Sequence, residues 1–121
     1  MATVNIVNVT SILPFNLFGS VTTSAVDVID VPADKLYKVN TIIISNIDGT
    51  NSANISIGVS RNNGSTYYNL ASTVAVPADS SLVVIDKNSS IYLDETDLLR
   101  VTASANSDLE YIISGEILDD A

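Results

Sequence analysis

The stretch Tyr37–Ile47, YKVNTIIISNI, decides the fold class of this 121-residue chain. It is rich in β-branched residues and contains neither glycine nor proline. This composition favours a strand, because branched side chains lose rotamer freedom in a helix. Its centre, Ile42–Ile44, is apolar on both alternating faces, so a strand here needs cover on both sides. We predict an inner strand with Val39, Ile43 and Ile47 on one face, and a buried helix is the competing interpretation.

Short extended segments separated by turn residues lie on both sides of this stretch. Residues 53–61 alternate apolar and polar side chains, the pattern of a half-buried strand. Asn62–Gly64 follows as a hairpin signal, because asparagine and glycine tolerate positive φ. Residues 99–105 and 109–117 repeat the alternation, and we predict that they form a final hairpin.

Two phase slips and two turns complete the pattern. We predict a strand over residues 3–10, in which the alternation slips between Ile6 and Val7, and either a β-bulge or a change of partner strand explains that slip. A second slip occurs at Val28–Ile29. The tetrapeptide Val-Pro-Ala-Asp occurs at 31–34 and at 76–79. Because proline favours the second position of a turn, we predict the same turn at two strand entries.

These segments predict an all-β fold. About eight short strands, spaced roughly 8–12 residues apart with Gly, Pro or Asn turns between them, are typical of a single-domain antiparallel β-sandwich. A jelly-roll-like order is preferred, and an Ig-like order is the alternative, since periodicity cannot choose between them. We assign residues 1–19 to an N-terminal arm or edge strand and residues 20–121 to the β-sandwich domain.

The composition restricts the function classes. Five Lys and Arg face 14 Asp and Glu, giving a formal net charge of −9, so we expect neither a nucleic-acid nor a membrane partner. The chain has no histidine and no cysteine, which removes the commonest general base, the commonest transition-metal ligands and the thiol nucleophile. We therefore expect no catalytic residues, no metal site and no cofactor, and we do not expect an enzyme. A hydrolase is the weakest alternative, and it would need a pH-dependent turnover that is lost on changing Asp94, Glu95 or Asp97.

The segment Ile12–Gly19 holds both phenylalanines of the chain. Pro14 cannot donate to a ladder, so we predict that this segment is not an inner strand. One interpretation places its apolar side chains at one end of the domain's own core. The other makes it an arm that docks on a neighbouring subunit, since exposed apolar patches mark partner sites. The candidate subunit or capsid contacts in it are Leu13, Phe15, Leu17 and Phe18.

Tyr67 and Tyr68 are further candidate contacts. They alternate along a predicted strand, so one should face inwards and the other outwards. An outward tyrosine could stack on a sugar or fill a partner's pocket, whereas strand propensity alone is the competing explanation.

The densest acidic cluster is Asp94, Glu95 and Asp97. We expect a solvated turn whose side chains cap local amides. A hard-cation site is the alternative, but the cluster lacks the spacing of an EF-hand loop.

Three segments carry a family resemblance: VPADKLYKVNTIIISNIDGT (31–50), SRNNGSTYYNLASTVAVPADSSLVVIDK (60–87) and IYLDETDLLRVTASANSDLEYIISGEI (91–117). They resemble small β-sandwich virion structural proteins of tailed bacteriophages, of the capsid decoration or cement type. The resemblance covers roughly residues 31–118, consists of turn and strand signatures, and identifies no catalytic residue. Residues 1–30 carry no part of it.

The resemblance implies a virion structural role. Within that class we expect a decoration protein on the capsid exterior that binds the major capsid protein as a homo-oligomer. A trimer is favoured by closed symmetry and by analogy. The alternative is a tail, fibre or head-tail adaptor component with a receptor- or carbohydrate-binding role.

Overall fold

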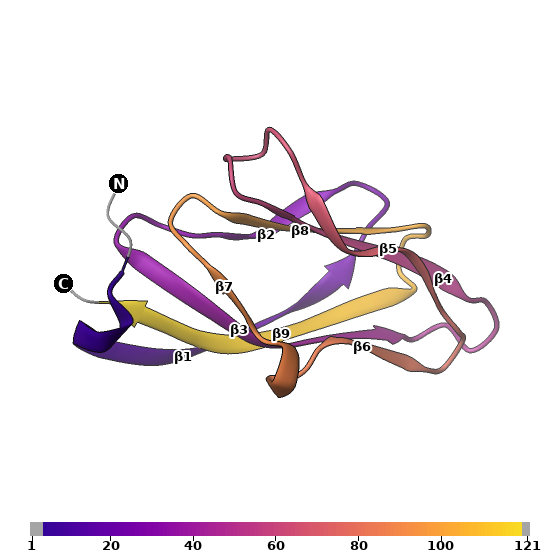
Figure 1. Ribbon diagram of the computed structural model, residues 1–121. Coiled ribbons are helices and arrows are strands. Elements are labelled where there is room, and N and C mark those ends of the chain that lie inside the picture. The colour runs from indigo at the N-terminus through magenta and orange to yellow at the C-terminus, as the bar shows by residue number, and fades with distance from the viewer. Residues whose placement is uncertain (1–3, 120–121) are drawn as a thin grey trace.

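Two antiparallel sheets pack face to face in the computed structural model, which describes residues 4–119. The five-stranded sheet has the order β1-β9-β3-β6, with β7 also paired to β3, and the four-stranded sheet has the order β2-β8-β4-β5 (Figure 1). The elements are η1 (Ile6–Asn8), β1 (Ser11–Val21), β2 (Val26–Asp30), β3 (Lys35–Asn46), β4 (Ala53–Ser60), β5 (Tyr68–Val76), β6 (Ser81–Ile85), η2 (Lys87–Ser89), β7 (Ile91–Leu93), β8 (Leu98–Ala103) and β9 (Leu109–Asp119).

The strand order is that of a jelly roll. β6 and β7 both lie along one edge of β3 and together take the place of one strand, so the nine strands fill the eight strand positions of a jelly roll. The predicted β-sandwich is therefore confirmed, and the jelly-roll order replaces the Ig-like alternative. The predicted final hairpin is wrong, because β8 and β9 belong to different sheets. Alternation tells which face of a strand is buried, but it does not name the neighbouring strand.

β3 is an inner strand, as predicted for Tyr37–Ile47, and the helical alternative is wrong. It pairs with β9 on one side and with β6 and β7 on the other. The predicted faces are wrong because the β3–β9 register shifts between Val39 and Thr41, and such a bulge reverses the phase of the side chains. Val39, Ile42 and Ile44 are fully buried, whereas Ile43 is half-buried on the opposite face and Ile47 is 55% exposed.

The chain begins differently from the prediction. The prediction of a strand over residues 3–10 is wrong for the described part of that range, which contains the short helix η1. The Asn5 side chain caps η1 by accepting a hydrogen bond from the Val7 amide. Val4 packs with Leu36 and Leu118 in a small apolar cluster of its own. The second slip in the sequence coincides with a shift of the β2–β8 register between Asp27 and Ile29.

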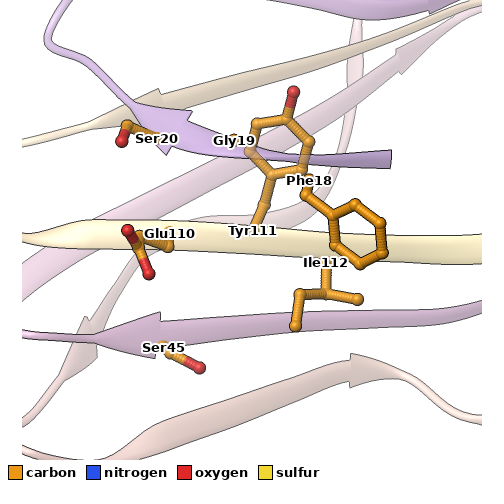
Figure 2. A pocket seen from close by; sticks show the side chains of 7 residues that line it. All are labelled: Phe18, Gly19, Ser20, Ser45, Glu110, Tyr111 and Ile112. Atoms are coloured by element: carbon orange, nitrogen blue, oxygen red, sulfur yellow. The ribbon is translucent and has the colours of Figure 1, made fainter. Parts of the chain in front are cut away.

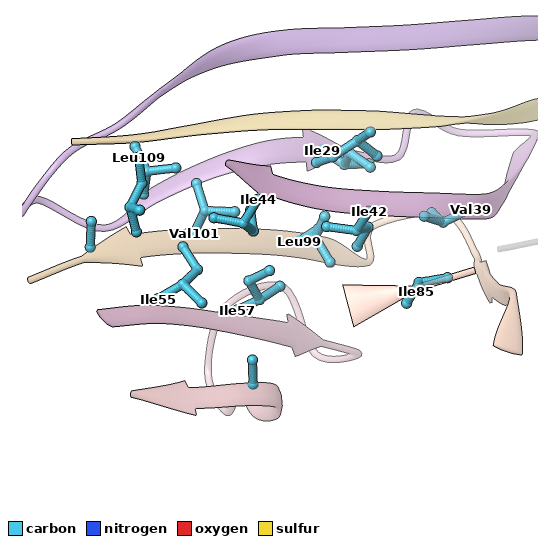
Figure 3. Close-up of a cluster of buried hydrophobic side chains, with 14 of the residues drawn as sticks. Ile29, Val39, Ile42, Ile44, Ile55, Ile57, Ile85, Leu99, Val101 and Leu109 are labelled. Carbon is cyan, nitrogen blue, oxygen red and sulfur yellow. The ribbon is translucent and has the colours of Figure 1, made fainter. Parts of the chain in front are cut away.

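Both sheets supply the core. Buried isoleucines, leucines and valines from the two layers point into the space between them (Figure 3). The predicted hairpin at Asn62–Gly64 is confirmed, because β4 and β5 pair on either side of it. The core leaves two outward sheet faces, and these carry the surface chemistry described below.

Candidate functional site

An apolar row crosses the outer face of the five-stranded sheet. The register places Phe18 of β1 beside Ile112 of β9, Ile112 beside Ile43 of β3, and Ile43 beside Val83 of β6. Phe18, Ile112 and Val83 are 68%, 41% and 56% exposed, respectively. With strands about 4.8 Å apart, the row is roughly 15 Å long. We call these four residues the apolar row.

A polar row runs next to it. Ser20 of β1, Glu110 of β9, Ser45 of β3 and Ser81 of β6 are aligned by the same register. The hydroxyl oxygens of Ser45 and Ser81 are 3.1 Å apart and share a hydrogen bond. The outer face therefore changes from apolar to polar within one row of side chains.

A shallow groove lies where the two rows meet. Its volume is about 330 Å³, and it is lined by Phe18, Gly19, Ser20, Ser45, Glu110, Tyr111 and Ile112 (Figure 2). Gly19 leaves room for the Tyr111 side chain, because a Cβ at this position would lie 2.8 Å from the Tyr111 hydroxyl oxygen. Figure 2 shows the Phe18 ring next to Ile112, with the Glu110 carboxylate farther along β9.

Glu110 is an unpaired carboxylate in this groove. The residue is exposed, and the Glu110 carboxylate makes no hydrogen bond or ion pair within residues 4–119. Its neighbours across the sheet are Ser20 and Ser45, which bring hydroxyl groups but no positive charge. The groove thus combines an apolar wall with a negative charge that no cation of the described chain neutralises.

The outer face of the four-stranded sheet carries a polar network around Tyr67. The Tyr67 hydroxyl donates a hydrogen bond to Asp27 Oδ1 at 2.8 Å. The guanidinium of Arg100 lies 3.8 Å from the centre of the Tyr67 ring, and its Nε is 3.4 Å from Asp27 Oδ1. Gly58 leaves room for this arrangement, because a Cβ there would be 3.3 Å from Tyr67 Cβ. The network fastens the β4–β5 loop to β2 and β8.

Ionisation of Tyr67 should break this network. Partial burial, and then the hydrogen bond to Asp27, raise the pKa of the Tyr67 phenol above its ordinary value. Because the pKa of Tyr67 is higher in the folded than in the unfolded state, its network stabilises the fold fully below the unfolded pKa, about 10. This stabilisation is lost as the pH rises through the folded-state pKa. Ultraviolet titration of the intact chain and of Tyr67→Phe should show one late-ionising tyrosine that the variant lacks. Identical titration curves would contradict the network.

The predicted contact residues do not all lie on one surface. Leu13 is 59% exposed, whereas Phe15 and Leu17 pack against the core, and the Phe15 ring centre is 5.1 Å from that of Tyr37. β1 is an edge strand of the five-stranded sheet, and of this segment only Phe18 joins the apolar row. Participation of these residues in subunit or capsid contacts stays a prediction.

The tyrosine pair differs from the expectation. Neither side chain belongs to the core cluster, because Tyr67 precedes β5 and leans over the outer sheet face, while Tyr68 is 73% exposed. The prediction that one of them faces inwards is wrong. Sequence reasoning also missed Ile43, Val83 and Glu110 as surface-site residues, because only the strand register brings them together.

The acidic turn is buried, and the expectation of a solvated turn is wrong. Glu95 and Asp97 are 4% and 2% exposed. Glu95 accepts a hydrogen bond from the Asp34 amide at 2.9 Å, and Asp97 accepts one from the Asp94 amide at 2.8 Å. Arg61 Nε lies 3.0 Å from an Asp97 oxygen. The predicted capping of local amides is confirmed by the bond from the Asp94 amide to Asp97. The bond from the Asp34 amide to Glu95 joins the β7–β8 turn to the β2–β3 turn.

Residues 4–119 contain no metal-binding cluster of acidic, histidine or cysteine side chains and no helix that could span a membrane. No group of three or more His, Cys, Asp or Glu side chains in that range is placed to hold a metal ion. None of its helices combines the length and apolar character needed to cross a bilayer.

Comparison with known proteins relates the chain to solved structures only. No protein-family model matches it, and no curated protein matches it. A chain of the disulfide-linked pili of Bacillus endospore appendages is 12% identical, with a TM-score of 0.56 over 92% of this chain and 88% of that one. A chain of the acidic stable capsid structure of Helicobacter pylori bacteriophage KHP30 is 7% identical, with a TM-score of 0.51 over 93% and 91%. At these identities the likeness concerns the fold alone.

Proposed function

We propose that this chain is a structural protein of a phage virion, and that it is a decoration or cement protein of the capsid. The observation that carries the proposal is the jelly roll, which spans nearly the whole chain and resembles a chain of a phage capsid over more than nine-tenths of both lengths. The sequence resemblance of residues 31–118 to phage virion proteins supports it independently. Fold likeness alone does not assign function, so the two arguments are needed together.

The pilus likeness is a weaker guide to function. The Bacillus appendages are described as disulfide-linked pili, whereas these 121 residues contain no cysteine. Links of that kind cannot form between copies of this chain. The virion role therefore remains the better-supported proposal.

The finer proposal is a homotrimer on the capsid exterior that binds the major capsid protein. A closed oligomer presents the same face several times, so modest individual contacts add up through a high effective concentration. The outer face of the five-stranded sheet, with the apolar row, is a suitable contact surface because exposed apolar patches mark partner sites.

Immunogold labelling of intact particles tests this proposal. An antibody raised against the purified chain should label the head surface of virions from the producing host, in numbers comparable to the capsomers. Sedimentation equilibrium of the purified chain should give a trimer. Absence of the chain from purified virions would overturn the virion role, and a stable monomer would overturn the trimer.

A tail or adaptor component with a carbohydrate-binding role is the second candidate, favoured by the exposure of Tyr68. Tyrosine offers a large contact area for stacking at a low cost in side-chain entropy. In this case the antibody should label the tail, and Tyr68→Ala should abolish binding of the chain to a glycan array. No glycan binding by the intact chain would remove this candidate.

A further inference from the structure

We infer that the groove between Phe18, Ile112 and Glu110 receives an arginine side chain of a protein partner. The inference rests on the proposed function for its choice of a protein as partner, and it deepens that function by naming the chemistry of the partner's surface. The groove lies on the outer face of the five-stranded sheet (Figure 2), whereas the Tyr67 network lies on the outer face of the four-stranded sheet.

The lining of the groove matches the two parts of an arginine side chain. Phe18 and Ile112 form an apolar wall, and long basic side chains bury their aliphatic stems along such surfaces while the charged head stays polar. Glu110 lies at the next outward position of β9, about 7 Å along the strand from Ile112. A stem resting on Ile112 therefore brings its head to the carboxylate.

The head of arginine fits the polar end of the groove. A guanidinium donates two parallel hydrogen bonds to one carboxylate and also stacks on aromatic faces. Glu110 supplies the carboxylate, and the Ser20 and Ser45 hydroxyls can accept further hydrogen bonds, while Phe18 belongs to the apolar wall beside the stem. A lysine offers a point charge without the planar match.

Charge argues against a second copy of this chain as the occupant of this groove. The chain carries a net charge of −9 and only five basic residues. Lys35, Arg61 and Arg100 are already paired with Asp119, Asp97 and Asp27, respectively. The arginine at this groove is therefore supplied by a partner with a basic surface rather than by another subunit of the proposed trimer.

An NMR titration of the intact chain with a small probe tests the inference. The probe is Nα-acetyl-arginine N-methylamide, and its control is the citrulline analogue, which has nearly the same shape but no charge. The amide signals of Ser45, Glu110 and Ile112 should shift saturably with the arginine probe. The citrulline probe should bind about two- to fivefold more weakly, the range expected for an exposed ion pair.

Variants separate the two halves of the groove. Glu110→Gln should reduce the affinity for the arginine probe to that for citrulline. Glu116→Gln, on the same strand and the same outward face, is the matched control and should bind as the intact chain does. Phe18→Ser should weaken both probes alike, because it removes part of the wall, and its exposure means that the fold is retained.

Equal binding of the two probes, or an equal loss in Glu116→Gln, would overturn the inference. Shifts of the same signals when the chain alone is concentrated would assign the groove to a second copy and would also overturn it. Immunogold labelling of virions is independent of these results, so failure of the arginine site and failure of the virion role can be told apart.

Discussion

Ile42→Ala should lower the free energy of unfolding by about 2–5 kcal/mol, the usual cost of truncating a fully buried isoleucine. Ile42 is 0% exposed and lies in the main core between the two sheets (Figure 3). The loss combines the transfer free energy of the deleted methyl groups with the cavity that they leave. Urea denaturation followed by circular dichroism measures it, provided that the denaturant dependence is unchanged.

Ile43→Ala is the matched control on the same strand. Ile43 lies in the apolar row on the outer face and is only half-buried, so its truncation should cost less than about 1 kcal/mol, since part of the side chain is already in water. The order of the two effects is decisive. If Ile43→Ala proved the more damaging, the phase of β3 given by the structure would be wrong.

This pair of variants marks the limit of what alternation alone predicts. Apolar and polar positions along residues 53–61 identify β4 and its buried face, because that strand keeps one phase from Ala53 to Ile57. In β3 the bulge at Asn40 reverses which side chains face the core. The local pattern of Val39, Asn40 and Thr41 does not predict this bulge. A bulge is set by the partner strand, which lies some seventy residues farther along the chain.

The same reason explains the sites that the sequence could not show. Phe18, Ile43, Val83 and Ile112 are far apart in the chain and share one row only through pairing of β1, β9, β3 and β6. The sequence could predict Phe18 as a candidate contact residue, because an apolar segment that contains a proline is a poor inner strand. Glu110 carries no sequence signal, since an isolated glutamate in a strand is usually a solvated side chain.

Burial of the acidic turn follows from tertiary contacts in a similar way. Asp94 and Asp97 have the residue types of a surface turn, and a turn of this kind is usually solvated. Here Glu95 reaches across to the Asp34 amide, and Arg61 approaches Asp97 from the β4–β5 loop. Those partners are distant in the sequence, so local turn chemistry predicts the capping but not the burial.

Gly115→Ala should destabilise the fold by about 3 kcal/mol or more, at the upper end of the cost of overpacking. A Cβ on Gly115 would lie 1.9 Å from the carbonyl oxygen of Lys38, which belongs to the backbone of β3 and cannot rotate away as a side chain could. The close approach arises beside the bulge at Asn40. Relief of the clash must therefore separate β3 from β9, the two central strands of the five-stranded sheet.

Gly49→Ala is the control for the loss of glycine itself. A Cβ at Gly49 would meet only the Asp79 carboxylate, at an ordinary contact distance of 3.5 Å, so the free energy of unfolding should change by no more than about 0.5 kcal/mol. Chemical denaturation of both variants in parallel gives the comparison. If Gly115→Ala were as stable as Gly49→Ala, the backbones of β3 and β9 could not approach as closely as the bulge requires. The reversed phase that exposes Ile43, and with it the continuity of the apolar row, would then lose its structural basis.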